Sequence, residues 1–387
     1  MNGSGVPTSH LAASRVWGVG ILGAGDIAPR YIESLRYARN LRLILIASRT
    51  REKMETMATR FGLAPVSPEQ LYTDPRIDLI LILTPPQHHA QAIRAALCAG
   101  KHVYCEKPFA SSRNECDELI AMARDRSLML ATAPATHLGP SVRALRELIR
   151  NETLGDVVGA AGTMIYPGPD LWHHDPDHLF AQGGGPLFDM GVYHLTVLVH
   201  LLGPIEAVHA FASRYRSERT IMKGPAAGTA VPVEVDTHVS INLRFASGAI
   251  GHLTCSFDGF GSRAPGLEIY GSKGSVAMGQ PNDFTAPLAV STAIGSWQEQ
   301  PTDPVWNDRM WAIGVVEAVA AWQRNAPPAA DPAAAAHVID VMRSVDQSVS
   351  NRRQVPVQSS CDRVYSLQPL ATDLWEPETS GHHATQE

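Results

Sequence analysis

The stretch VWGVGILGAGDIAPRYIESLRYA, residues 16–38, determines the fold of the first part of the chain. It opens with a short apolar run, after which the apolar spacing changes to a helical period that places Ile27, Tyr31 and Leu35 on one side. Pro29 falls in the first turn of this helix, where its missing N–H group is not needed. The stretch therefore predicts a strand, a tight turn and a helix.

The turn carries the spacing GxGxxA, formed by Gly23, Gly25 and Ala28. A first glycine permits the turn, a second lets the backbone approach a pyrophosphate, and a small third residue lets the helix pack closely on the sheet. The helix N-terminus then offers its positive end to the phosphates. The motif alone is weak, but the strand and helix around it favour a dinucleotide site over a glycine turn without a ligand.

Further apolar runs continue this pattern at residues 41–48, 77–86, 101–106 and 128–134, with helical patterns among them. Near-continuous apolar strands that alternate with helices are typical of a parallel sheet covered on both faces. We therefore predict an α/β dinucleotide-binding domain over residues 15–135. The preceding residues 1–14, rich in glycine, serine and proline, are expected to be a disordered leader.

The pattern changes after about residue 135. The alternating segments VEVDTHVSINLRF and IGHLTCSF predict an antiparallel strand pair with one open face, and LEIYGSKGSVAM predicts a hairpin. Helical patterns return at residues 308–324 and 333–350. We predict an α+β domain for substrate binding and oligomerisation over residues 136–357, followed by a partly disordered extension at 358–387.

Composition limits the classes of function. The chain has 387 residues, is 44% hydrophobic, and carries 32 Lys and Arg against 38 Asp and Glu, with no basic block that would track phosphates. No apolar run approaches the roughly 20 residues that a membrane span needs. Its five cysteines are an odd number without CxxC spacing, which argues against a disulfide framework or a structural zinc site. We expect a cytoplasmic protein with neither nucleic-acid nor membrane partners.

The end of the second predicted strand bears on the choice of dinucleotide. An NAD site usually carries an acid there for the ribose hydroxyls, whereas this chain has Ser48, Arg49 and Thr50. Arg49 could pair with a ribose phosphate, and the two hydroxyls could donate to it. NADP is therefore favoured and NAD is the alternative, since Arg49 could instead be a solvated surface residue.

Several segments together resemble the Gfo/Idh/MocA oxidoreductase family. They are LTPPQHHAQAIRAAL, AGKHVYCEKPFA, GGGPLFDMGVYHL, VDTHVSINLRFASGAIGHLTCSFD and EIYGSKGSV, within about residues 15–357. The resemblance implies a Rossmann domain joined to a domain with a large, open, mostly antiparallel sheet, with substrate held over the nicotinamide between them. Besides the residues named above, it points to cofactor contacts from Asp26, Ile27, Thr84, Pro85, His89 and Glu106.

Glu106, Lys107 and Pro108 match the family's EKP motif, whose lysine reaches the oxygen of the carbon that gains or loses hydride. A lysine in a closed cleft can stabilise the charge that develops on such an oxygen. Desolvation is expected to lower its pKa toward neutrality. The alternative is a solvated lysine after a strand. The resemblance also implies a cis peptide bond before Pro108.

The segment GGGPLFDMGVYHL departs from the commonest family pattern, in which a histidine follows the aspartate by four residues. Here that position is Tyr193, and His194 is displaced by one. Helical geometry places Tyr193 on the face of Asp189 and His194 about 140° away. We assign Lys107 and Tyr193 to proton transfer, with the ionised phenol favoured by the lysine, and Asp189 to orienting a substrate hydroxyl. His194 either contacts substrate or packs.

The loop DLWHHDPDHLF offers Trp172, His173 and His178 as an aromatic wall with polar groups for a polyol. Metal binding by its histidines and acids is the alternative, although hydride transfer to nicotinamide needs no metal. An exposed polar loop is the third reading. His238 and His337 are expected to be structural.

These features predict an NADP-dependent oxidoreductase that interconverts a secondary alcohol and a ketone on a sugar, glycoside or cyclic polyol. Two alternatives stay open. One is an enzyme that retains its nicotinamide and uses transient oxidation to assist glycoside cleavage or epimerisation. The other is a non-catalytic dinucleotide-dependent sensor, a role the family also includes. The open sheet predicts a homodimer or homotetramer.

Overall fold

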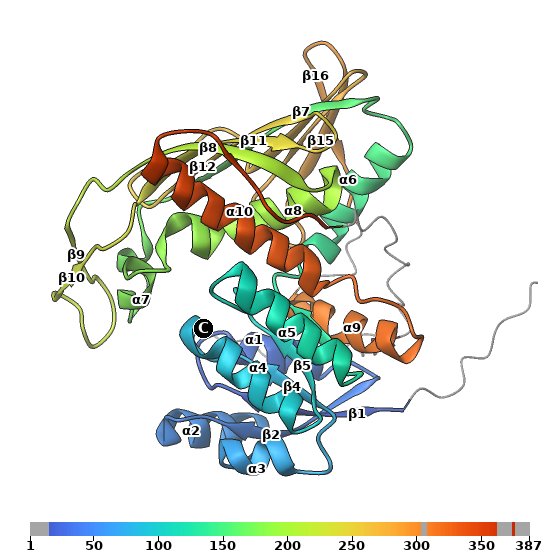
Figure 1. Cartoon of the computed structure of the whole chain (residues 1–387), viewed down its shortest axis with the longest axis vertical. Helices are drawn as coiled ribbons and strands as arrows, with labels where there is room; N and C mark the ends of the chain where they lie inside the picture. The colour runs from blue at the N-terminus through green and yellow to red at the C-terminus, as the bar shows by residue number, and fades with distance from the viewer. Residues whose placement is uncertain (1–14, 303–307, 362–373, 376–387) are drawn as a thin grey trace, which may run out of the picture.

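The computed structural model describes residues 15–302, 308–361 and 374–375. It contains a lower domain built on a parallel sheet and an upper domain built on a large, mostly antiparallel sheet (Figure 1). The expected leader and most of the C-terminal extension lie outside the described residues. Among the helices of the described part, none combines the length and the apolar character that crossing a bilayer requires.

The lower domain is a six-stranded parallel sheet of order β3-β2-β1-β4-β5-β6. Its strands are β1 (Trp17–Leu22), β2 (Leu41–Ala47), β3 (Ala64–Pro65), β4 (Leu79–Ile82), β5 (His102–Cys105) and β6 (Leu130–Thr132). Its helices are α1 (Ala28–Leu35), α2 (Arg51–Phe61), α3 (Pro68–Thr73), the 3-10 turn η1 (Pro86–His88), α4 (His89–Cys98) and α5 (Arg113–Asp125). This strand order is that of a doubly wound Rossmann fold and confirms the predicted α/β class.

The apolar runs become strands because both faces of the sheet are covered. All six residues of β1 and all four of β4 are buried, so neither strand has a polar face to give to solvent. In α1 the buried positions include Tyr31, Ile32 and Leu35, which is the side predicted from the apolar spacing. The strand, turn and helix at the start of the chain are thus confirmed.

The upper domain contains a nine-stranded sheet of order β16-β15-β14-β13-β7-β12-β11-β8-β17. Its strands are β7 (Val157–Ile165), β8 (Ile205–Ser213), β11 (His238–Phe245), β12 (Ile250–Ser256), β13 (Leu267–Gly271), β14 (Ser275–Met278), β15 (Leu288–Ala293), β16 (Ser296–Gln300) and β17 (Val355–Pro356), while β9 (Glu218–Thr220) and β10 (Ala230–Pro232) form a separate pair. Only β7 and β12 run parallel; the other neighbours are antiparallel. The predicted pair and hairpin are confirmed.

Helices cover the face of this sheet that looks toward the lower domain. The helical segments of the region are the 3-10 turn η2 (Thr136–Leu138), α6 (Pro140–Arg150), the 3-10 turn η3 (Pro169–Leu171), α7 (Asp177–Phe180), the π-turn η4 (Leu187–Gly191), α8 (Val192–Leu202), the 3-10 turn η5 (Asp308–Ala312), α9 (Ile313–Gln323) and α10 (Pro332–Asn351). Figure 1 shows α8 and α10 lying between the sheet and the lower domain. The opposite face carries exposed side chains such as Phe211 and Ile250.

Helix α9 belongs by packing to the lower domain, although it falls within residues 136–357. Its buried residues share one core with β1 and α1. Ser34 Oγ accepts a hydrogen bond from the backbone N–H of Ala312 (3.0 Å), and Gly314 packs so closely on Tyr104 that an added Cβ would lie 2.4 Å from the phenol oxygen. The chain therefore crosses back after the large sheet, and the expected boundary near residue 135 does not separate the two cores.

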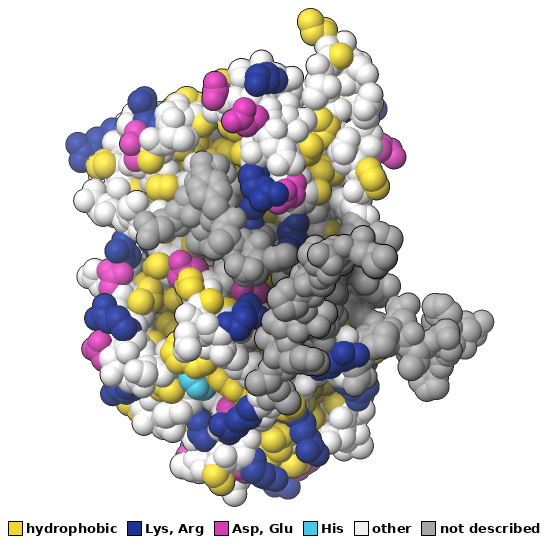
Figure 2. All heavy atoms as spheres, turned by 90° about the vertical axis from the view of Figure 1, so that its right-hand side faces the viewer, with side chains coloured by type: hydrophobic (Ala, Val, Ile, Leu, Met, Phe, Trp, Pro, Cys, Tyr) yellow, Lys and Arg dark blue, Asp and Glu magenta, His cyan; other side chains and the backbone are white. Residues whose placement is uncertain are grey.

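Charged side chains of both signs are interspersed over the face seen in Figure 2, on both domains. Along the lower edge of this face, dark-blue Lys and Arg side chains outnumber the magenta ones.

Candidate active site

A cleft of about 780 Å³ runs along the carboxyl ends of the parallel strands. Such crevices are where ligands bind in open α/β sheets. Its walls come from four regions: the turn after β1, the end of β2 with α2 and α3, the segment from β4 into α4, and the EKP segment after β5. The segment 173–178 of the upper domain closes the far side. The expected cofactor residues lining it are Gly23, Gly25, Asp26, Ile27, Ser48, Arg49, Thr50, Thr84, Pro85, His89, Glu106 and Lys107.

The glycine turn leaves space and donors for a phosphate group. Gly23 has a φ of +118°, and a Cβ there would lie 2.5 Å from the carbonyl oxygen of Leu83. Gly25 faces open space, with nothing within 4 Å of an added Cβ. Within the described residues no side chain caps the N-terminus of α1 at Ile27. An uncapped helix N-terminus beside an open glycine fits a pyrophosphate.

The buried hydroxyl of Thr84 is a second observation that fits a bound ligand in the cleft. Its hydroxyl oxygen is buried at the cleft and has no hydrogen-bond partner among the described residues. Buried polar atoms normally have partners, so an orphan in a cleft points to a ligand group. Together with the open glycine, it makes the donor set fit a dinucleotide.

The EKP carboxylate is fixed from two sides. Glu106 Oε1 accepts from the hydroxyl of the buried Tyr31 (2.6 Å), and Oε2 accepts from the backbone N–H of Lys107 (3.0 Å). Tyr31 comes from α1, the helix that follows the glycine turn. The hydrogen bond from Tyr31 therefore links the helix after the glycine turn to the EKP segment.

His89 holds loops together. Its ring is fully buried, with Nε2 2.6 Å from the carbonyl oxygen of Thr84 and Nδ1 2.7 Å from that of Pro108. Burial lowers the pKa of His89. Because both nitrogens face backbone carbonyls, the ring positions the Thr84 and EKP segments and presents neither nitrogen to a cofactor. The peptide bond between Lys107 and Pro108 is cis, as expected.

The adenosine end of the cleft combines hydroxyls and cations. Ser48, Arg49 and Thr50 line it, and so does Lys53 from the first turn of α2. The sequence reasoning missed Lys53, although it lies only four residues beyond Arg49. Arg49 and Lys53 are both exposed, so their charges are free to meet a phosphate that enters the cleft.

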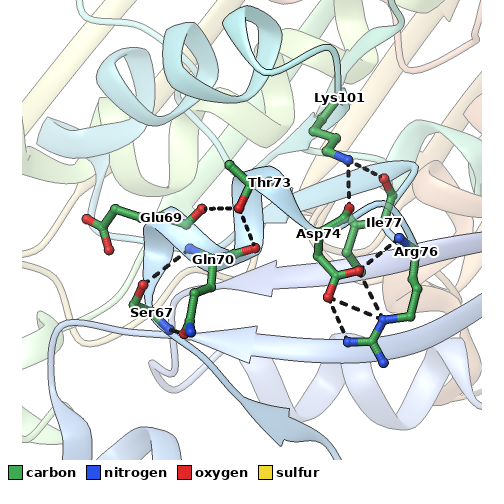
Figure 3. A network of polar contacts seen from close by, with 8 residues as sticks. All are labelled: Ser67, Glu69, Gln70, Thr73, Asp74, Arg76, Ile77 and Lys101. Carbon is green, nitrogen blue, oxygen red and sulfur yellow. Dashed lines mark hydrogen bonds and ion pairs between the residues drawn. The ribbon is translucent and has the colours of Figure 1, made fainter.

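Helix α3 forms another part of the cleft wall and contributes Glu69. A capping box begins it: Gln70 N donates to Ser67 Oγ (3.2 Å), and Ser67 N donates to Gln70 Oε1 (2.9 Å). At its end Lys101 Nζ donates to the carbonyl oxygens of Asp74 and Ile77, both at 2.8 Å (Figure 3). This network fixes the wall against the sheet.

Lys107 reaches across the domain boundary to Asp189. Its Nζ donates to the Asp189 carbonyl oxygen (2.6 Å) and to the carboxylate Oδ1 (3.2 Å), and it lies 5.2 Å from the centre of the Tyr193 ring. The glycine-rich segment enters α8 through the π-turn η4, and such turns occur often at functional sites. The structure thus brings Lys107, Asp189 and Tyr193 together.

The pKa of Lys107 is raised. Burial acts to lower it, but Tyr193, Asp189 and Glu106 together outweigh burial. The expected shift toward neutrality is therefore wrong, because the ammonium has a carboxylate and a carbonyl oxygen as acceptors. Burial raises the pKa of Tyr193 to about 12, although Lys107 acts to lower it. The expectation of an easily ionised phenol is also wrong: the pair is an ammonium and a neutral phenol.

Tyr166 is a member of the site that the sequence reasoning missed. Its hydroxyl donates to Asp189 Oδ2 (3.5 Å), and its ring packs edge-on against Phe257, with 5.1 Å between ring centres. Burial and then Asp189 raise its pKa. Tyr166 directly follows β7, and a polar aromatic side chain at a strand end was the available signal.

His194 does not reach the cleft. It is 1% exposed, its Nε2 lies 3.1 Å from the carbonyl oxygen of Gly266, and it packs against Gly162 of the sheet. Burial lowers its pKa to about 4. The expectation that it contacts substrate is corrected: even with the irregular helix start, its ring points into the core.

The histidine loop lies at the cleft, but Trp172, one of its expected members, does not line it. His173 and His178 line it together with His174, whereas Trp172 is 53% exposed and is not part of the cleft wall. Trp172 instead packs edge-on against His173, with 5.4 Å between ring centres. The expectation that Trp172 lines the cleft is therefore wrong, and the loop contributes His173, His174 and His178 instead.

The same loop touches the dinucleotide turn. His174 Nδ1 lies 3.4 Å and His173 Nε2 3.7 Å from Asp26 Oδ2. Burial and then His178 lower the pKa of His173. The upper domain therefore closes over the point where a pyrophosphate would lie.

Arg219 anchors the segment that precedes this loop. The guanidinium is buried and pairs with Asp170 (3.3 Å) and Asp258 (2.5 Å). It also donates to the carbonyl oxygens of Pro167 (2.9 Å) and Phe257 (2.7 Å). Nothing in the sequence distinguished it.

Other histidines are structural, as expected. His337 is buried, and its Nε2 accepts from the backbone N–H of Ile205 (2.9 Å). His238 Nδ1 lies 3.0 Å from Ser256 Oγ within the strand pair. In the described part of the chain, no group of three or more His, Cys, Asp or Glu side chains is arranged to hold a metal ion.

Known proteins resemble the chain over most of its length. Residues 17–133 match a family model described as "Oxidoreductase family, NAD-binding Rossmann fold", and residues 142–277 match the "GFO/IDH/MocA C-terminal domain". A trans-1,2-dihydrobenzene-1,2-diol dehydrogenase from Mus musculus is 30% identical over 301 residues, covering 76% of this chain and 83% of that protein. A levoglucosan dehydrogenase from Pseudarthrobacter phenanthrenivorans is 28% identical over 253 residues, covering 60% of this chain and 64% of that protein.

The fold is also shared with solved structures. A levoglucosan dehydrogenase in complex with NADH superimposes with a TM-score of 0.77 at 22% identity, covering 89% of this chain and 100% of that chain. At that identity the likeness concerns the fold of both domains.

Proposed function

Because the chain belongs to the Gfo/Idh/MocA family of oxidoreductases, we propose that it is an NADP-dependent enzyme that interconverts a secondary alcohol and a ketone on a sugar, glycoside or cyclic polyol. The observation that carries this proposal is the contact of Lys107 with Asp189 and Tyr193 at the end of the dinucleotide cleft. A non-catalytic sensor would have no need for such a buried ammonium.

Lys107 stabilises negative charge on the substrate oxygen. Bound nicotinamide supplies or accepts the hydride, and the protein residues manage the accompanying proton. In the direction of ketone reduction, the ammonium of Lys107 and the phenol of Tyr193 both donate hydrogen bonds to the carbonyl oxygen, and one of them gives its proton. Asp189 orients a neighbouring substrate hydroxyl and keeps Lys107 charged.

The reverse direction needs a proton acceptor. A charged Lys107 takes a proton from a substrate hydroxyl only after losing its own. Asp189 Oδ1, 3.2 Å from the ammonium, is the adjoining group that can receive that proton.

Arg49 and Lys53 support NADP over NAD. Both line the cleft near Ser48 and Thr50, where an adenosine ribose is expected. Two exposed cations at this place favour a phosphate on the ribose over free hydroxyls. Ser48 and Thr50 add hydroxyl donors.

The testing experiment is a substrate panel. Purified protein is incubated with NADP+ and NAD+ against free sugars, glycosides and inositols, and with NADPH and NADH against keto-sugars, while nicotinamide absorbance is followed. The proposal expects turnover that prefers NADP(H). Turnover with NAD(H) alone overturns the cofactor assignment, and tight binding without turnover of any substrate overturns the activity.

One observation favours a second candidate, an enzyme that retains its nicotinamide through the catalytic cycle. The contact of His173 and His174 with Asp26 covers the middle of the cleft and would hinder release of the cofactor. Nicotinamide that copurifies with the protein and shows no net redox change during substrate conversion distinguishes this candidate from a dehydrogenase that exchanges its cofactor.

The open face of the large sheet supports self-association. Phe211 is 70% and Ile250 51% exposed on this face, and apolar side chains on an uncovered sheet are a self-association surface. A homodimer or homotetramer is expected in analytical ultracentrifugation, and replacing Phe211 with a charged residue should shift it toward the monomer.

A further inference from the structure

A second chamber, of about 190 Å³, lies at the seam between the two domains beside the dinucleotide cleft. It is bounded by η1 and the segment after Lys107 from the lower domain, and by α7, the segment after it and α10 from the upper domain. Pro86, Gln87 and His178 line both the chamber and the cleft. The two spaces are therefore neighbours separated by shared side chains.

The chamber adjoins the reactive end of the cleft. Pro108 and Phe188 form part of its wall, and each is the chain neighbour of a reactive residue, Lys107 and Asp189 respectively. When one ring of a substrate is held at Lys107, a second ring attached to it can extend into this chamber.

The floor of the chamber is apolar and its rim is polar. Ala110, Ile339 and Met342 are buried at the floor, whereas Gln87, Gln182 and His178 are exposed at the rim. An apolar surface with amide and imidazole groups around it suits a ring that has C–H faces and edge hydroxyls.

The charge balance of the chamber selects against an anion. None of its lining residues is Asp or Glu, and Arg343 is its single permanent cation. That cation is already compensated: its Nη1 lies 3.2 Å from Asp346 Oδ2, its Nε donates to the Ser111 carbonyl oxygen (3.0 Å), and it stacks 4.6 Å from the Phe188 ring centre. A neutral ring fits better than a phosphate or carboxylate.

We propose that this chamber is a second sugar subsite, so that the enzyme's preferred substrate is a neutral glycoside of two rings, one held at Lys107 and the other in the chamber. This inference rests on the proposed function, since it takes the reacting ring to lie at Lys107. It narrows the substrate class from any sugar or polyol to disaccharide-like glycosides.

The test compares one- and two-ring substrates. The best monosaccharide from the panel is matched with α- and β-linked disaccharides that carry it at the non-reducing end. Binding to the NADPH-loaded protein is measured by titration calorimetry, and kcat/KM is measured with NADP+. We expect at least one disaccharide to bind about tenfold or more tightly than the monosaccharide and to show a correspondingly higher kcat/KM.

Gln182 provides the variants. Gln182→Trp places a large side chain at the rim and should lower the disaccharide-to-monosaccharide ratio of kcat/KM at least about tenfold, while Gln182→Ala should change it less than about threefold. Gln298→Trp, the same change at an exposed position of β16, is the matched control and should leave the ratio unchanged.

The outcomes separate this inference from the proposed function. Monosaccharide turnover without tighter disaccharide binding, or a ratio that Gln182→Trp leaves intact, overturns the subsite and keeps the activity. Tighter disaccharide binding that Gln182→Trp abolishes, without redox turnover of any sugar, supports the subsite and overturns the proposed reaction. Equal binding of all sugars in the absence of turnover overturns both.

Discussion

Lys107 donates to Asp189 twice, once to its backbone carbonyl oxygen at 2.6 Å and once to its carboxylate at 3.2 Å. The main-chain contact comes from the π-turn Leu187–Gly191, where the helix that carries Asp189 has not yet become regular. A side chain of the Rossmann domain is thereby fixed to the backbone of the other domain. The ammonium is held in place before any substrate arrives, which is the preorganisation that electrostatic catalysis requires.

Replacing Lys107 with methionine should abolish most turnover. In the proposed mechanism the Lys107 charge stabilises the substrate oxygen, and because the variant removes it we expect kcat to fall about 100-fold or more. Dinucleotide affinity, measured by fluorescence titration, should change less than about threefold, because the phosphate and adenosine contacts are untouched. Lys273→Met, at an exposed hairpin turn, is the matched control. A Lys107→Met variant with normal kcat would refute the mechanism.

The pH profile should reflect two raised pKa values. The pKa of Lys107 lies above its ordinary value and that of Tyr193 is about 12, so both groups stay protonated to higher pH than free side chains. We therefore expect kcat/KM for ketone reduction to show no alkaline loss from these groups between about pH 7 and 10. Tyr193→Phe should lower kcat roughly 10- to 100-fold. An alkaline fall near pH 8 that disappears in Tyr193→Phe would contradict the assignment.

The sequence predicted the sheet, the glycine turn and the proximity of Asp189 and Tyr193 because each depends on local signals, whereas the assignment of Lys107 came from the family resemblance. Strand runs, GxGxxA spacing and the four-residue step from Asp189 to Tyr193 are all properties of neighbours in the chain. The pKa direction of Lys107 could not be predicted the same way. It depends on Tyr193 and Asp189, both far along the chain, which together with Glu106 outweigh desolvation only in the folded arrangement.

The site residues that the sequence did not predict have roles that depend on residues distant in the chain. Tyr166 and Arg219 acquire their roles from partners that the fold brings to them, Asp189 for one and both Asp170 and Asp258 for the other. His194 was misplaced for the converse reason. The predicted angle assumed a regular α-helix from Asp189 to His194, whereas Asp189 lies in the π-helical turn Leu187–Gly191. The position of the sheet then decides that the His194 ring points into the core.

Arg49 and Lys53 should determine the choice of dinucleotide. Because a charge-assisted hydrogen bond contributes about 1.5–3 kcal/mol, we expect Arg49→Ala and Lys53→Ala each to lower kcat/KM for NADPH roughly 10-fold or more. The values for NADH should change less than about threefold. Arg51→Ala is the matched control, since Arg51 pairs with Glu55 (2.7 Å) and does not line the cleft. Equal losses with both cofactors would show that these cations do not read a ribose phosphate.

Tyr166 should act through Asp189. Tyr166→Phe keeps the ring packing on Phe257 and removes only the hydroxyl, so the melting temperature should stay within about 1 °C. Loss of one neutral hydrogen-bond donor to the carboxylate should lower kcat/KM roughly 3- to 10-fold. The effect should vanish in an Asp189→Asn background, as a double-mutant cycle would detect. Additive losses would mean that Tyr166 acts elsewhere.

Asp74 should contribute stability at neutral pH that is lost in acid. Its carboxylate accepts hydrogen bonds from the Arg76 side chain and from the Arg76 backbone N–H (Figure 3). These hydrogen bonds, the side-chain one most of all, lower the pKa of Asp74 to about 2. A carboxyl whose folded pKa lies below its unfolded value stabilises the fold above the unfolded value, near 4, and loses that contribution as the pH falls toward about 2. Because Arg76 is 61% exposed, solvent screening limits the effect to about 1 kcal/mol or less. Asp74→Asn should therefore lower the melting temperature by roughly 1–2 °C at pH 7, and the difference should shrink below about pH 4.

The control for Asp74 is an aspartate–arginine pair in which both side chains are exposed. Asp125 lies 3.3 Å from Arg124, with both side chains well exposed, so Asp125→Asn should leave the melting temperature unchanged. Differential scanning calorimetry at several pH values measures both variants. Since Asp74 ends the helix that carries Glu69 to the adenosine wall, its loss should also raise KM for the dinucleotide slightly, about twofold. Identical melting curves for Asp74→Asn and Asp125→Asn would show that the network of Figure 3 does not stabilise this wall.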